Sequence, residues 1–319
     1  MILQKTGLRH NCFRLLCLAL FLAITSCSTD NSQKTITRKA GEKLRIVTTT
    51  GIIADAVRNI AGEKAEVISI MGPGVDPHLY KATQGDLEKL TTADLVIYNG
   101  LHLEGKMGEV LEKLSRTRKV VTITRHLDKA LLRNSADYPG SYDPHIWFNV
   151  ALWQKATAAI TTHLTDLDPE NTNYYLERAK NYATELNGLH NWATEQIATI
   201  PESQRVLITA HDAFGYFGDA YKIEVRGLQG ISTVSEFGLR DVSDLVGFIT
   251  ERKIKAVFVE SSVPKKAIEA VVTGARDRGH EVSIGGELFS DALGQEGTPE
   301  GTYAGMVRHN VNTITRALR

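Results

Sequence analysis

Cysteine is almost absent from this chain of 319 residues. The three cysteines, Cys12, Cys17 and Cys27, all lie near the N-terminus, so the chain after residue 27 contains no thiol. Disulfide bonds are therefore excluded there, and about 290 residues can bury a stable apolar core without them. Thiolate ligation is excluded as well. A site for a soft metal ion would have to consist of imidazole and carboxylate groups.

An excess of either charge is also missing, because 37 basic residues balance 37 acidic ones. No basic stripe is present, so nucleic acid is not expected as a partner. The hydrophobic share of 42% and the charged share of 23% are typical of a globular protein. The length predicts two domains, and the lack of a repeat of about 20 to 50 residues argues against a solenoid.

Long apolar runs are rare, and the clearest one, Leu15–Ile24, lies between three basic residues and Cys27. This pattern predicts a secretory signal over residues 1–26, because the run is short for a permanent transmembrane helix. The residues before Cys27 resemble a bacterial lipobox, which implies cleavage before Cys27, a lipid on its sulfur and attachment of the exported protein to a bacterial membrane. The polar residues that follow predict a tether, so 27–43 form the lipidated cysteine and its linker. An ordinary signal peptide with an incidental cysteine is the alternative.

From residue 44 onward, short apolar segments alternate with helical patterns. This alternation predicts two parallel-sheet α/β lobes, over residues 44–167 and 202–319. The expected strands are 44–49, 65–70, 94–98 and 120–124 in the first lobe, and 206–209, 224–228, 256–260 and 281–284 in the second.

A single long helical pattern separates the lobes, over residues 168–201. Asp168 is a plausible N-cap, Pro169 occupies the first helical position and Pro201 follows the end. Apolar residues recur at steps of three and four, which predicts one buried face. At about 1.5 Å per residue, such a helix is about 45 Å long and would connect the lobes rigidly.

Two loops of the first lobe each carry the triplet Asp-Pro-His, at 76–78 and at 143–145. Prolines and glycines around the first triplet predict a rigid turn that presents His78. In each triplet, the aspartate can accept a hydrogen bond from the ring of its neighbouring histidine or cap the following turn. His78 and His145 are therefore candidate metal ligands.

Two further loops follow strands of the second lobe. His211 stands at a strand-to-helix junction, where side chains face a crevice. The last predicted strand is followed by Gly285 and Gly286, and then by two candidate carboxylates, Glu287 and Asp291. Spacing alone does not choose between these carboxylates.

Two more polar residues follow predicted strands. His102 is expected near the site as an outer partner and not as a ligand. Glu260 is expected to make a structural hydrogen bond that closes the two lobes, and not to act as a catalytic acid.

These motifs, in this order, resemble those of the cluster A-I metal-binding lipoproteins of ABC importers, the TroA-like and ZnuA-like group. The pieces that carry the resemblance over residues 44–319 are the two Asp-Pro-His triplets, Thr-Ala-His-Asp-Ala-Phe-Gly-Tyr-Phe at 209–217, Gly-Ile-Ser-Thr at 230–233, Glu-Ser-Ser-Val-Pro at 260–264 and Ser-Asp-Ala-Leu-Gly at 290–294. The resemblance implies that His78 and His145 of the first lobe and His211 and Asp291 of the second bind one ion in the cleft between the lobes. It therefore favours Asp291 over Glu287.

The resemblance also implies a function, namely capture of one zinc or manganese ion per chain by a monomer and its delivery to an ABC permease with its ATPase. Histidine at position 211 resembles the zinc-binding members, although a long histidine-rich loop typical of zinc-specific relatives is missing from residues 125–142. Zinc is favoured and manganese is the alternative. Four protein ligands would nearly fill a tetrahedral or slightly expanded shell and leave little room for an attacking water, so an enzyme is not expected. A secreted zinc metallohydrolase and a binder of siderophore or cobalamin-type chelates are the competing functions.

Overall fold

The computed structural model describes residues 41–135 and 139–319, which belong to one compact unit. The predicted signal over 1–26, the lipidated Cys27 and most of the predicted tether lie outside the described residues. Within the described ranges, no helix has both the length and the apolar character that crossing a bilayer requires.

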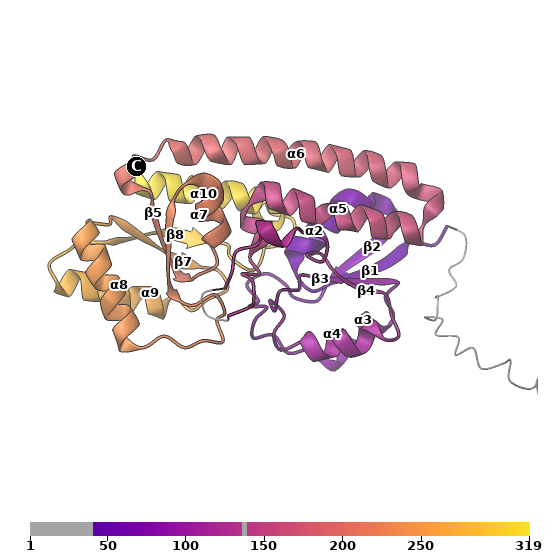
Figure 1. The fold of residues 1–319 in the computed structure, drawn as a ribbon, viewed down its shortest axis with the longest axis horizontal. Coiled ribbons are helices and arrows are strands. Elements are labelled where there is room, and N and C mark those ends of the chain that lie inside the picture. The colour runs from indigo at the N-terminus through magenta and orange to yellow at the C-terminus, as the bar shows by residue number, and fades with distance from the viewer. Residues whose placement is uncertain (1–40, 136–138) are drawn as a thin grey trace, which may run out of the picture. The chain divides into compact units, whose positions relative to one another are not determined.

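The first lobe is built on a four-stranded parallel sheet with the order β2-β1-β3-β4 (Figure 1). Its strands are β1 (Leu44–Thr48), β2 (Ala65–Ser69), β3 (Leu95–Tyr98) and β4 (Val120–Thr122). Its helices are α2 (Gly51–Ala61), α3 (Gln84–Thr91), α4 (Gly108–Ser115) and α5 (Val150–Leu167). The helix α2 begins directly after β1, where the Thr50 side chain accepts a hydrogen bond from the Ile53 N–H. All four strands run in one direction, so the loops after them meet at one edge of the sheet.

The second lobe contains two parallel strand pairs, in which β5 (Val206–His211) joins β6 (Glu224–Gln229) and β7 (Ala256–Glu260) joins β8 (Ser283–Leu288). The strands β5 and β7 pack next to each other. The helices of this lobe are α7 (Gly215–Tyr221), α8 (Leu239–Arg252), α9 (Lys266–Asp277) and α10 (Tyr303–Leu318). The short 3-10 helices of the two lobes are Gly62–Lys64, Lys129–Leu131, Ile146–Phe148, Pro169–Asn171, Glu202–Gln204 and Pro299–Gly301.

The last strand differs from its prediction, because β8 begins at Ser283 and runs through Gly285 and Gly286 to Leu288. A side chain at Gly285 would come within 2.7 Å of Ala317 on α10 and 2.8 Å of a Phe258 ring carbon. Glycine therefore lets α10 pack against the strand and does not end it. The other predicted strands overlap the observed ones.

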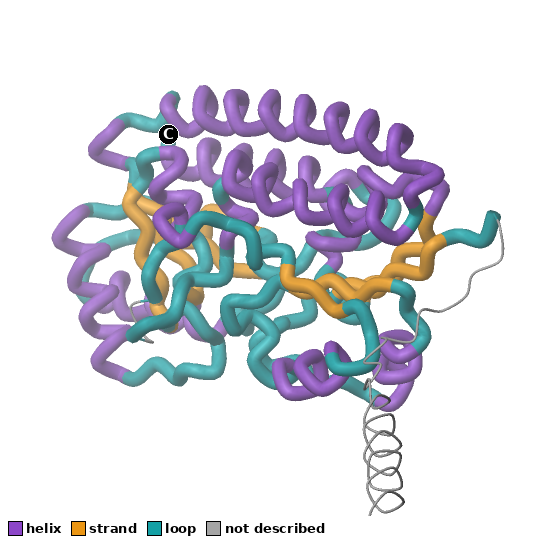
Figure 2. The backbone as a smooth tube through the Cα atoms, turned by 45° about the vertical axis from the view of Figure 1, so that its right-hand side comes forward, coloured by secondary structure: helices purple, strands orange, loops and turns teal. Residues whose placement is uncertain are grey.

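The helix α6 (Thr172–Ala198) lies along both lobes, next to α5 of the first lobe and α10 of the second (Figures 1 and 2). Its buried face includes Tyr175, Leu186 and Ile197. This face belongs to a continuous apolar core that also contains Ile46 of β1 and Leu207 of β5. The predicted fold class, two parallel α/β lobes joined by one long helix, is confirmed, and this helix shares one apolar core with both lobes.

Candidate metal centre

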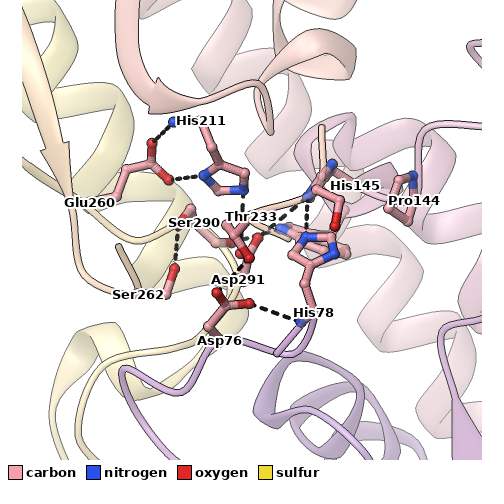
Figure 3. A network of polar contacts seen from close by, with 12 residues as sticks. Asp76, His78, Pro144, His145, His211, Thr233, Glu260, Ser262, Ser290 and Asp291 are labelled. Carbon is pink, nitrogen blue, oxygen red and sulfur yellow. Dashed lines mark hydrogen bonds and ion pairs between the residues drawn. The ribbon is translucent and has the colours of Figure 1, made fainter. Parts of the chain in front are cut away.

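The turn after β2 presents His78. The His78 N–H donates to Asp76 Oδ1 at 2.8 Å, which fixes the backbone at this position. The other oxygen of Asp76 accepts a hydrogen bond from Thr233 Oγ1 of the second lobe at 2.6 Å. The first Asp-Pro-His triplet thus holds the histidine through its backbone and also contacts the opposite lobe (Figure 3).

The second triplet presents His145 in a different way. Asp143 Oδ1 accepts from the His145 N–H at 2.9 Å and lies 2.8 Å from the ring Nδ1. With Nδ1 bound to the carboxylate, Nε2 is the nitrogen that is free for a metal ion. The neighbouring Trp147 donates from Nε1 to the Ser290 carbonyl at 3.0 Å, which joins this loop to the second lobe. Of the two predicted contacts between aspartate and an imidazole ring, the structure shows the one at Asp143.

In the second lobe, His211 is the last residue of β5, and Glu260 is the last residue of the neighbouring β7. Glu260 Oε1 accepts from the His211 N–H at 2.9 Å, and Oε2 lies 2.6 Å from the ring Nδ1. The prediction that Glu260 closes the two lobes is therefore wrong, because its partner lies on the next strand of the same lobe. Glu260 instead orients the His211 ring, with Nε2 directed toward the other histidines.

Asp291 follows β8 and is almost completely buried. Its Oδ2 lies 3.3 Å from His211 Nε2, and its Oδ1 lies 3.6 Å from His145 Nε2. Within the described part of the chain, these imidazoles are the partners of its two oxygens, and no backbone or hydroxyl group donates to them, which is unusual for a buried carboxylate. Glu287, the rival candidate, is 41% exposed and pairs with Lys265 at 2.7 Å. The structure brings Asp291, and not Glu287, to the histidines.

The four candidate ligands converge on one point between the lobes (Figure 3). One donor atom from each of His78, His145, His211 and Asp291 lies within 4.8 Å of the others, and all four residues are buried. The Nε2 atoms of His78 and His145 are 3.3 Å apart. In a tetrahedral zinc site, donors at about 2.1 Å from the ion are about 3.4 Å from one another. The 3.3 Å between His78 and His145 is close to this value, as are the 3.3 and 3.6 Å from the two oxygens of Asp291 to His211 and His145.

Burial and charge give His78 and His211 different protonation states. Burial lowers the pKa of the His78 imidazole to about 3. It also acts to lower the pKa of His211, but the carboxylates of Glu260 and Asp291 outweigh it and raise this pKa well above its ordinary value. Burial acts to raise the pKa of Asp291, whereas His211 and the other imidazoles hold it below its ordinary value. An arriving cation therefore meets a neutral His78, and it replaces a proton on His211.

The two α/β lobes joined by one long helix, and the buried cluster of three imidazoles and one carboxylate between them, define a metal-binding member of the solute-binding class of transport proteins. The chain belongs to the ZnuA family, described as the periplasmic component A of the zinc-uptake complex, whose sequence model matches residues 46–317. The family resemblance inferred from the motifs is confirmed.

Relatives named for two different metals support this assignment. The chain is 50% identical over 297 residues to the manganese-binding lipoprotein MntA of Bacillus subtilis, which covers 93% of this chain and 95% of MntA. It is 49% identical over 279 residues to the zinc-binding protein TroA of Treponema pallidum, which covers 88% of this chain and 90% of TroA. The solved structure of periplasmic TroA from the same organism matches with a TM-score of 0.85, at 49% identity, and covers 87% of this chain and 99% of that one.

Proposed function

We propose that this protein captures one divalent transition-metal ion through His78, His145, His211 and Asp291 and delivers it to an ABC permease and its ATPase. The observation that carries the proposal is the convergence of four buried donor atoms, two from each lobe, within 4.8 Å. Three imidazoles and a carboxylate suit zinc, and the usual order of divalent affinities places manganese below it. Zinc is therefore the favoured cargo and manganese the alternative, in line with the metals that TroA and MntA are named for.

The location of the protein forms the second part of the proposal. The signal over residues 1–26 and the lipidated Cys27 would place the two lobes, as a monomer, outside the cytoplasm and attached to a bacterial membrane, facing the periplasm or the cell exterior. The relative MntA is itself named a lipoprotein, which supports this location. Position beside the membrane would bring the captured ion within reach of the permease.

The competing functions lack support at the site. A metallohydrolase needs an open coordination position and a nearby general base. Four protein donors fill a tetrahedral shell, and the candidate base Glu287 is exposed and paired with Lys265. A chelate binder needs ligand groups far enough apart for a large organic molecule, whereas these four donors lie within 4.8 Å of one another.

Native mass spectrometry of the purified protein tests the proposal. The wild type should carry one ion per chain after exposure to zinc or manganese salts, and His211→Ala should carry none. His126→Ala is the matched control, because His126 is exposed and lies outside the cluster, so this variant should keep its ion. Retention of the ion by His211→Ala, or a wild type without metal that binds an iron chelate, would refute the proposal. Competition between the two salts then decides the preferred metal.

A further inference from the structure

A cavity of about 380 Å³ lies beside the metal centre. Its wall includes His78, His102 and Lys106 from the first lobe and Ser232 and Val234 from the second. Of the four candidate ligands, His78 is the one that lines it. The cavity is therefore a path along which an ion from solution would meet His78 first.

The cavity can hold a hydrated cation. A water molecule occupies about 30 Å³ in the liquid, so six waters around an ion need about 180 Å³, roughly half of the cavity. No carboxylate of the described chain lines it, and the Lys106 ammonium repels a cation, although an exposed charge is screened by salt. The lining groups that suit coordination of a transition metal are the imidazoles of His78 and His102.

His102 is exposed at the rim of this cavity, in an uncommon backbone conformation. Leu101 and His102 have φ angles of 53° and 66°, in the left-handed region that non-glycine residues avoid. The buried carboxylate of Glu104 holds the loop, because it accepts hydrogen bonds from the N–H groups of Asn99 and Gly100. Two consecutive residues in this region are costly, and such strain persists where surrounding contacts enforce it, often at functional sites.

The His102 and His78 backbones are neighbours across Gly105. A Cβ atom on Gly105 would lie 3.6 Å from the His78 carbonyl oxygen and 3.8 Å from that of His102. The loop that carries His102 therefore lies against the backbone of His78, and both residues line the same cavity.

We propose that His102 is a transient ligand, which takes the hydrated divalent ion at the cavity rim and passes it to His78. The imidazole replaces one water of the hydration shell, and His78 then replaces another as the ion moves inward. This inference rests on the proposed function of the cluster. It concerns the rate of capture and not the final affinity, because His102 does not hold the ion at the end.

Stopped-flow mixing with zinc and manganese salts tests this role, with the fluorescence of Trp147 as the signal, since its ring lies 5.3 Å from that of His145. Asparagine and aspartate both tolerate the left-handed conformation, so His102→Asn and His102→Asp form a matched pair. The carboxylate of aspartate binds cations well, whereas the neutral amide of asparagine does not. We expect His102→Asn to slow association about tenfold, within the range over which such rates vary between variants. Dissociation should slow by the same factor, so that Kd is kept. His102→Asp should restore both rates.

The exposed His126 supplies controls for the loss of an imidazole and for the change of charge, as His126→Asn and His126→Asp. Neither should alter the rates at physiological salt. Rates of His102→Asn equal to those of the wild type would overturn the inference, and so would a weaker Kd with unchanged association, which would make His102 a ligand of the final site. In both cases the wild type still binds one ion per chain. The role of His102 can therefore fail while the proposed function of the cluster stands.

Discussion

The two lobes supply their candidate ligands by different means. In the first lobe, His78 and His145 belong to short turns in which an aspartate two residues earlier accepts the histidine N–H. In the second lobe, His211 ends a strand and depends on Glu260, 49 residues away on a neighbouring strand. The first lobe therefore fixes its ligands by local structure and the second by tertiary packing. Local turns can adjust without disturbing a sheet, so we expect rearrangement on metal release to be concentrated in the first-lobe loops.

Among substitutions that keep all four candidate ligands, Glu260→Gln is expected to weaken metal binding the most. Glutamine keeps the shape but removes the buried negative charge that orients the His211 ring and makes it basic. Loss of such an outer partner weakens metal binding by up to about 100-fold. Competition titration of zinc against a chelating dye measures the change. Glu287→Gln is the control, because that carboxylate is exposed and pairs with Lys265, and it should leave Kd unchanged. Equal affinity of Glu260→Gln and wild type would mean that His211 needs no partner.

His211 of the second lobe should contribute a pH dependence to metal binding. Without metal, His211 carries a proton at neutral pH because its pKa is raised, whereas His78 is neutral because its pKa is about 3. The ion must displace the His211 proton, so affinity falls as pH falls, by about tenfold for each pH unit below that raised pKa. The same titration repeated at several pH values gives the slope. A change in log Kd of two or more per pH unit would show that further imidazoles are protonated in the free protein. Glu260→Gln should reduce the pH dependence of Kd.

In the first lobe, Asp143→Asn should weaken zinc binding by about tenfold, the lower end of the range for outer partners. The carboxylate contacts the His145 ring at 2.8 Å, and asparagine provides a weaker, uncharged acceptor. Asp76→Asn is the matched comparison, because Asp76 contacts the backbone of His78, and its effect should be smaller. Isothermal titration with a competing chelator measures both. A larger effect at Asp76 would show that backbone placement outweighs ring orientation.

The same difference explains what the sequence could predict. Strands and the long helix follow from local apolar patterns, and the Asp-Pro-His turns are local too, so His78 and His145 could be proposed from residues alone. His211 could also be proposed in this way, from its place at the end of a predicted strand. Asp291 could be separated from Glu287 only through a family resemblance. The exposure of each carboxylate depends on how β8 and the loop after it pack against the rest of the protein. The role of Glu260 was predicted wrongly, since the packing of β5 beside β7 is not encoded in the spacing of either strand. The extent of β8 was missed because the close approach of α10 at Gly285 is tertiary.

The contact between the lobes at Thr233 should have the smallest effect on binding. Thr233→Val removes the hydroxyl that donates to Asp76 Oδ2 at 2.6 Å, while Thr233→Ser keeps it. Burial raises the pKa of Asp76 and the Thr233 hydroxyl opposes this, so its loss should raise the pKa further. A hydrogen bond to a charged group contributes about 1.5 to 3 kcal/mol, and we expect urea unfolding to show a loss near the lower value because Asp76 is partly buried. Zinc affinity should fall only about threefold, because the His78 ring is not contacted and α6 with its core still joins the lobes. A loss as large as that of Glu260→Gln would instead make this contact between the lobes, and not the packing of the second lobe, the main determinant of the site.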